Sequence, residues 1–190
     1  MSKTLSLCMW LLLLWPGTAR AQAPPSRWGI SLAYFGEFVT HPGVTISAER
    51  YLFNNGTYQV FVGAQAGGYV HRRNHTGLFV GLETGHRITM KSGLFFDQHL
   101  GLGYLHTFLN GGDVFEADAL RGAYEVKDGG RGHVMPSVSV GTGWTFRDGA
   151  GQPRWSVFAR PVVFWQYPFN NYALVHPALQ AGATYLLPAR

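Results

Sequence analysis

The segment from Thr76 to Met90 reads TGLFVGLETGHRITM. Large apolar residues occupy every second position, as in a β-strand with two different faces: Leu78, Val80, Leu82, Ile88 and Met90. The other face combines glycine with charge: Gly77, Gly81, Glu83, Gly85, Arg87 and Thr89. That face is neither an apolar core nor an ordinary wet surface. The environment on each side of this strand therefore decides the fold.

The composition of the chain limits the classes of protein it can belong to. It has 190 residues, enough for one domain, of which 13% are charged and 25 are glycine. Low charge together with 15% aromatic residues argues against disorder. The formal net charge is +5, but Arg72-Arg73 is the only cluster of basic residues outside the first 21 positions. We therefore expect no nucleic-acid partner.

Residues 1–21 have the pattern of a secretory signal peptide. A single lysine precedes an apolar run from about Leu5 to Trp15, and Ala19-Arg-Ala21 provides a small-x-small cleavage motif. We predict cleavage before Gln22, which leaves 22–190 as one domain. Cys8 lies inside the leader, so the exported domain is expected to be stable without disulfides.

The alternation of the opening segment recurs along the whole chain. We predict eight strands, at about 27–39, 42–53, 57–72, 76–91, 94–109, 132–147, 153–168 and 172–187, in an antiparallel meander. Connections alternate in length. Short turns at 54–56, 91–93 and 147–152 fall on one side, while 40–42, 72–75, 168–171 and the long loop 110–131 fall on the other. This asymmetry is typical of outer-membrane barrels.

The two faces of these strands differ in side-chain size. One face is large and apolar, with residues such as Trp28, Ile30, Leu32, Val62, Leu100, Leu102, Val138, Val140 and Val157. The other collects Gly63, Gly67, Gly81, Gly85, Gly101, Gly103, Gly141, Gly143 and Gly182, with Ser31, Ser47, Ser137, Ser139, Gln59, Gln65 and Gln180. That second face has too little charge for the outside of a soluble barrel. We predict that the large residues face lipid, that the small ones line a narrow polar lumen, and that aromatic residues form a girdle near each end.

In these features the chain resembles the small eight-stranded outer-membrane β-barrels of the OmpA/OmpX type, and it is most similar to the outer-membrane barrels of Bacteroidetes-like bacteria. The last strand, from Ala181 to Leu187, is similar to their terminal assembly signal, but the chain then ends Pro188-Ala-Arg190. The resemblance implies a closed, eight-stranded, antiparallel up-and-down transmembrane barrel in the outer membrane of a Gram-negative bacterium. It also implies lipid, lipopolysaccharide and the barrel-assembly machinery as partners.

Charged residues on the inward face are expected to meet inside the barrel. A three-residue hairpin at 91–93 places Arg87 opposite Asp97, and Gly85 opposite His99. An eight-stranded barrel is just wide enough for side chains to fill. We predict a lumen plugged by a polar network of Glu49, Glu83, Arg87, Asp97, His99, Arg160 and His176. The alternative is a proton or ion path through the same residues.

Histidines are concentrated at the predicted extracellular rim, at positions 41, 71, 75, 106, 133 and 176. Candidate rim ligand-binding residues are His41, His71, Arg72, Arg73, His75 and His133. Imidazole and carboxylate groups together suit a divalent transition metal, although no known metal-site spacing occurs here, so a metal site stays open. The arginine pair suits lipopolysaccharide phosphates or a solvated loop tip equally.

We expect a monomeric, non-enzymatic protein with an envelope-structural or surface-interaction role and no cofactor. The alternative is a lipid A-modifying enzyme, but no histidine is followed at the second position by serine, and His133 with Ser137 remains open only through the fold. The loop 110–131 is a candidate docking site for an envelope protein. Its Val114, Phe115, Leu120 and Tyr124 suit either a partner or packing over the barrel mouth.

Overall fold

The computed structural model describes residues 28–72, 74–110, 115–118, 123–126, 130–169 and 172–188. Eight long strands form one sheet: β1 (Trp28–Glu37), β2 (Gly43–Asn54), β3 (Tyr58–His71), β4 (His75–Thr89), β5 (Leu94–Leu109), β8 (Arg131–Arg147), β9 (Pro153–Phe169) and β10 (Tyr172–Leu186). Their ends lie within two residues of the predicted ones. The strand prediction is therefore confirmed, because alternation of period two extends over every segment.

The sheet closes on itself into a barrel. Its strands follow the order β1-β10-β9-β8-β5-β4-β3-β2, all antiparallel, and β1 pairs with β10 from Gly29 opposite Leu186 to Glu37 opposite Ala178. Closure leaves no unpaired strand edge, which a sheet in hydrocarbon requires. No helix in the described ranges is long and apolar enough to cross a membrane.

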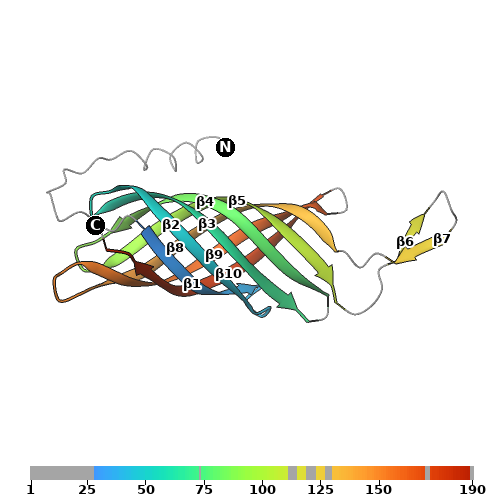
Figure 1. Cartoon of the computed structure of the whole chain (residues 1–190), viewed down its shortest axis with the longest axis horizontal. Helices are drawn as coiled ribbons and strands as arrows, with labels where there is room; N and C mark the ends of the chain where they lie inside the picture. Colours follow the sequence, from blue (N-terminus) through green and yellow to red (C-terminus); the bar gives the residue numbers. More distant parts are fainter. Residues whose placement is uncertain are drawn as a thin grey trace, which may run out of the picture.

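The two ends of the barrel have different connections. We call the end with the connections 55–57, 90–93 and 148–152 the turn end, and the end with 38–42, 72–74, 110–130 and 170–171 the loop end. Two short strands in the long connection, β6 (Phe115–Asp118) and β7 (Ala123–Val126), pair into a separate hairpin. Figure 1 shows this hairpin beyond the loop end of the barrel. Val114 and Leu120, and the side chains of Phe115 and Tyr124, lie outside the described part.

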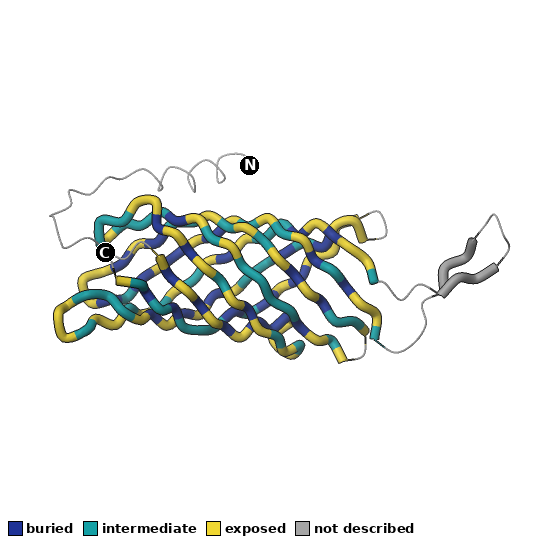
Figure 2. The backbone as a smooth tube through the Cα atoms, in the orientation of Figure 1, coloured by how far each residue is buried: buried dark blue, intermediate teal, exposed yellow. Residues whose placement is uncertain are grey.

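Large apolar side chains cover the outside of the barrel. Leu82 is 69% exposed and Leu102 is 63% exposed, and Figure 2 shows exposed and buried positions alternating along the strands. Exposed aromatic residues lie toward both ends, among them Trp28, Phe96, Trp144, Phe146 and Trp155 at the turn end and Phe38, Tyr104, Phe108 and Tyr167 at the loop end. The predicted outward face and its aromatic girdles are confirmed.

The inside differs from the predicted polar lumen, because large aromatic rings share it with the glycines. Phe79 lies on the same face as Gly77 and Gly81 and is buried. Three apolar clusters fill the interior. The first contains Phe35, Tyr69, Phe79, Leu105, Met135, Phe164 and Ala178; the second contains Ala33, Phe95 and Phe158; the third contains Tyr51, Phe61 and Leu186. Buried polar and charged side chains occupy the rest of the interior, so the sequence predicted the polar lining but not the apolar clusters.

The glycines of the inner face provide the space that these rings occupy. Phe61 lies directly opposite Gly85 in the strand register, and Phe79 lies opposite Gly67. A Cβ atom at either glycine would fall 2.7 Å from the Cζ atom of the facing ring. Rings and glycines therefore form cross-strand pairs, as in other sheets where an aromatic side chain covers a glycine.

Gly67→Ala is expected to lower the free energy of unfolding by about 1–3 kcal/mol, since overpacking forces the neighbours to move. The new Cβ would lie 2.6 Å from the carbonyl oxygen of Val44 and 2.7 Å from the Phe79 ring. The measurement is urea unfolding in detergent micelles. Gly149→Ala is the control, because a Cβ there meets nothing within 4 Å. Equal stability of both variants would contradict the pairing of ring and glycine.

Candidate functional site

The polar residues inside the barrel form two separate groups. We call Glu49, Glu83, Arg87, Asp97, His99 and Arg160 the central network. We call Glu37, His41, His71, His75, His133, Gln166 and His176 the mouth cluster, because these residues lie toward the loop end. The first apolar cluster lies between the two groups. Its Phe164 ring stacks on His176 at 4.8 Å, and its Phe35 and Phe79 line the same small cavity as Glu83 and His99.

The Arg87–Asp97 pair is the core of the central network. The two residues face each other in the register of β4 and β5, as the hairpin at 91–93 predicts. Arg87 donates from Nη2 and Nε to Asp97 Oδ2 at 2.9 and 3.2 Å. Both side chains are buried. Two donors on one carboxylate oxygen make this a charge-assisted contact of the strong kind.

Other residues extend this pair across the barrel. Arg87 Nη1 donates to the Tyr51 hydroxyl at 3.1 Å, and that hydroxyl donates to Glu49 Oε2 at 3.1 Å. Arg160 Nη2 lies 3.7 Å from Asp97 Oδ2. His99 lies 3.4 Å from Glu83 and 3.5 Å from Asp97. Three carboxylates thus face two guanidinium groups, and a positive charge on His99 would bring the sum to zero.

Aromatic rings enclose the central network on the side of the turn end. The guanidinium carbon of Arg87 lies 4.4 Å from the centre of the Phe95 ring, and that of Arg160 lies 4.3 Å from the Phe158 ring. His99 contacts Phe61 at 4.8 Å. Such cation–π contacts are most favourable when the charge is shielded from water.

Three atoms of the central network have no hydrogen-bond partner within the described residues: Asp97 Oδ1, His99 Nε2 and Arg160 Nε. Donor atoms of Glu49, Glu83 and His99 also lie within 4.8 Å of one another, a spacing open to a cation. Arg87 lies 3.8 Å from Glu49 and Arg160 lies 3.7 Å from Asp97, and repulsion from these two guanidinium groups disfavours a further cation there.

His176 does not belong to the central network, contrary to the sequence-based prediction. Its Nδ1 donates to Glu37 Oε1 at 2.8 Å, and its Nε2 lies 3.1 Å from Gln166 Oε1. The inward parity of His176 was correct. The predicted position of His176 along the barrel axis was wrong, because the alternation of residues along a strand shows which face a side chain is on but not how far along the barrel it lies.

A chain of hydrogen bonds fixes the proton positions in the mouth cluster. His133 Nδ1 must donate to the Pro168 carbonyl at 2.8 Å, so its Nε2 accepts from Gln166 Nε2 at 2.9 Å. The Gln166 oxygen then faces His176 Nε2, which must donate. His176 therefore bridges Glu37 and Gln166 through its two ring nitrogens.

The remaining rim residues lie beside this chain. Glu37 also accepts from His41 Nδ1. The His41 and His71 rings lie 3.7 Å apart between centroids, and His71 and His75 lie 5.7 Å apart. Arg72 is exposed, and Arg73 lies outside the described residues. The structure thus brings His41, His71 and His75 together and connects His133 to Glu37 through Gln166 and His176.

The prediction of site residues missed Glu37, Gln166 and Tyr51. Glu37 is on the inward face of β1, like the odd-numbered residues Ser31, Ala33 and Phe35, and it is 2% exposed. The same parity places Tyr51 with Glu49 on β2, and Gln166 with Phe164 on β9. The alternation of inward and outward residues along the strands is enough to place all three side chains inside the barrel. Tyr51 and Gln166 were overlooked because glycine and formal charge were the features used to define the inner face.

The arrangement gives no support to a histidine–serine catalytic pair. His133 and Ser137 are four residues apart on β8, about 13 Å at the usual rise of a strand. The accepting nitrogen of His133 is also already occupied, by Gln166 and by Thr107 at 3.1 Å. An imidazole that activates a hydroxyl must lie within hydrogen-bond reach of it.

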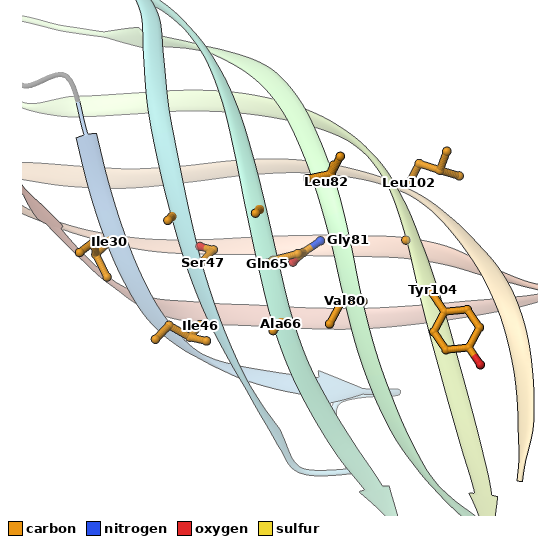
Figure 3. A pocket seen from close by; sticks show the side chains of 13 residues that line it. Ile30, Ile46, Ser47, Gln65, Ala66, Val80, Gly81, Leu82, Leu102 and Tyr104 are labelled. Atoms are coloured by element: carbon orange, nitrogen blue, oxygen red, sulfur yellow. The ribbon is translucent and has the colours of Figure 1, made fainter. Parts of the chain in front are cut away.

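Two hollows on the outer surface are apolar. One, of about 680 Å³, is lined by small residues such as Ala48, Ala64 and Ala66 and bordered by larger ones. Figure 3 shows Leu82, Leu102 and Tyr104 along its edge. The second hollow reaches Arg50, whose guanidinium lies 5.7 Å from the Trp28 ring. Acyl chains suit such hollows, so we assign them to the lipid-facing surface.

The barrel is similar to solved structures of small surface proteins. Neisserial surface protein A matches with a TM-score of 0.51 and 11% identity, over 84% of this chain and 96% of that one. Ail, the attachment invasion locus protein of Yersinia pestis, matches with a TM-score of 0.50 and 12% identity, over 85% and 97%. No protein-family model and no curated protein matches the chain.

These similarities establish a fold. The chain is a closed, eight-stranded, antiparallel transmembrane β-barrel. More particularly, it has the architecture of the small outer-membrane barrels, in agreement with the resemblance seen in the sequence.

Asp97→Ala is expected to lower the free energy of unfolding by about 3–5 kcal/mol, because it leaves two buried guanidinium groups without their shared carboxylate. The double variant Arg87→Met with Asp97→Leu is expected to be more stable than Asp97→Ala, since it removes both charges. The measurement is unfolding in micelles by tryptophan fluorescence. Arg154→Ala, which breaks the surface pair with Asp148, is the control and should change stability far less. Equal losses in Asp97→Ala and Arg154→Ala would contradict a structural central network.

Proposed function

We propose that this protein acts at the outer membrane of a Gram-negative bacterium as a non-enzymatic, monomeric barrel with an envelope-structural or surface-interaction role. The observation that supports this most is the filled interior. The cavity between the first apolar cluster and the central network measures about 10 Å³. That volume is close to the minimum that holds one water molecule, roughly 10–15 Å³. A lumen plugged in this way leaves the outer surfaces of the barrel for function.

The orientation follows from the connections. Outer-membrane barrels have short turns on the periplasmic side and longer loops outside, so the turn end would be periplasmic and the loop end extracellular. The hairpin β6–β7 then extends from the cell surface, where an envelope protein or a host component can reach it. Lipid and lipopolysaccharide would surround the apolar outer face, and the exposed Arg72 at the loop end would suit their phosphate groups. Insertion would require the barrel-assembly machinery.

A narrow ion path is the second candidate, favoured by the three unpartnered polar atoms of the central network. Apolar clusters lie on both sides of this network. Phe61, Phe95 and Phe158 contact it toward the turn end, and the cluster of Phe35, Phe79 and Phe164 lies toward the loop end. An ion crossing the barrel would have to lose its hydration at both clusters, at a cost of several kcal/mol or more.

In planar lipid bilayers we expect no steady open-channel conductance from the wild-type barrel. Replacing Phe79 and Phe164 together by Ala removes two buried rings from the first apolar cluster and is expected to give short openings. Leu82→Ala with Leu102→Ala is the matched control, because it removes similar apolar volume from the outer face. A stable conductance level in the wild type would overturn the plugged lumen.

A second measurement tests the surface role. A photo-crosslinker placed within 110–131 is expected to capture specific envelope or surface components in cells, whereas one at 148–152 at the turn end captures different ones. Replacing 111–129 by a short Gly-Ser linker should abolish the first set and leave the barrel folded. Identical adducts from both ends would contradict a role at the loop end.

A further inference from the structure

We infer that the mouth of the barrel holds a binding site for a divalent transition metal such as Zn²⁺ or Cu²⁺. His41 and His71 are its donors, His75 lies beside His71, and Glu37 orients His41. This site is independent of the proposed surface role. It would add a chemical activity, metal capture, to the loop end.

Three imidazoles meet here because of the topology. His41 follows the turn after β1, while His71 ends β3 and His75 begins β4 directly opposite it. The His41 and His71 rings are 3.7 Å apart.

Glu37 prepares His41 for a metal. The carboxylate can only accept, so His41 Nδ1 carries the proton of their hydrogen bond and Nε2 is left with its lone pair. This carboxylate–imidazole arrangement supports the histidine ligands of metal sites, because it fixes the tautomer and the ring orientation. Glu37 is itself held by His176 at 2.8 Å. Within the described chain, both ion-pair partners of Glu37 are imidazoles.

The backbone around His41 is held as firmly as its side chain. Phe38 and Val39 have φ angles of 46° and 64°, in the left-handed region that is costly for a β-branched residue. The turn is stabilised by the Tyr34 hydroxyl, which donates to the Val39 carbonyl at 2.7 Å, and by paired backbone bonds between Glu37 and His41. A strained conformation that the surroundings enforce is frequent at binding sites.

His71 provides an unused donor atom. Its Nδ1 is buried and has no hydrogen-bond partner among the described residues. Its Nε2 lies 3.5 Å from the Asn74 amide, which is long for a hydrogen bond. A buried polar atom without a partner is unfavourable, and a metal bond would satisfy it. The side chain of His41 is 22% exposed, so the site can be reached from solvent.

The donor set selects the class of metal. Imidazole nitrogen suits Zn²⁺, Cu²⁺ and Ni²⁺, whereas Mg²⁺ and Ca²⁺ prefer oxygen ligands. Within the described residues, Glu49, Glu83 and His99 in the central network are the one set of three such donors whose atoms all lie within 4.8 Å of one another. They lie among two guanidinium groups and are enclosed by apolar rings. The mouth cluster is therefore the better site, since it offers neutral donors and access.

The test is titration of the untagged, full-length protein in detergent micelles with ZnCl₂ by isothermal calorimetry. We expect one Zn²⁺ per chain, no heat from Mg²⁺ or Ca²⁺, and nitrogen hyperfine coupling in the electron paramagnetic resonance spectrum of bound Cu²⁺. His41→Ala and His71→Ala should each weaken Zn²⁺ binding at least about tenfold, and Glu37→Gln roughly 10–100-fold. His86→Gln is the matched control, because His86 points outward and packs on Tyr58 near the turn end.

Three results would overturn the site. The first is the absence of Zn²⁺ or Cu²⁺ binding to folded wild-type protein. The second is an equal loss in the His86→Gln control. The third is a stabilising response to inorganic phosphate but not to Zn²⁺, which would make the mouth an anion site. Folding of each variant is judged by heat-modifiable migration in detergent gels. If His41→Ala fails to fold, the Zn²⁺ affinity of Glu37→Gln and the Cu²⁺ spectrum of the wild type still test the metal site.

Discussion

The requirement that every backbone polar group in hydrocarbon be paired underlies this structure. An eight-stranded sheet meets it only by closing, and here β1 pairs with β10 along nearly its whole length. Closure separates the lipid outside the barrel from its interior, and alternate residues of each strand face one or the other. Large apolar side chains face lipid, and whatever remains must fill a cylinder just wide enough for side chains.

Filling that cylinder explains the glycines, which first suggested a polar lumen. A ring on one strand needs room that only a glycine on the next strand leaves, and Phe61 with Gly85 or Phe79 with Gly67 shows the arrangement. The rings then create dry layers, and charges between dry layers must neutralise one another. The Arg87–Asp97 pair with its neighbours does so.

The sequence was sufficient for the strands, the faces and the Arg87–Asp97 pairing, because each depends on period two and on a local turn. Depth in the barrel was not accessible in the same way. His176 and Arg160 share a face, yet one contacts Glu37 at the mouth and the other contacts His99. Their heights depend on the tilt and stagger of the whole barrel. The role of Glu37 was likewise hidden, since its partners come from β10 and from the turn before β2.

The central network and the mouth cluster differ in how their polar atoms are paired, and this difference associates the first with stability and the second with binding. In the central network Arg87, Arg160 and His99 each lie close to a carboxylate, so the charges compensate internally, and rings exclude outside partners. In the mouth cluster His176 bridges the Glu37 carboxylate and the Gln166 oxygen, Gln166 donates to His133, and Glu37 also fixes His41. Lone pairs of His41 and His71 are left at an accessible end. Interaction with the environment is therefore expected at the mouth, whereas the central charges serve the fold.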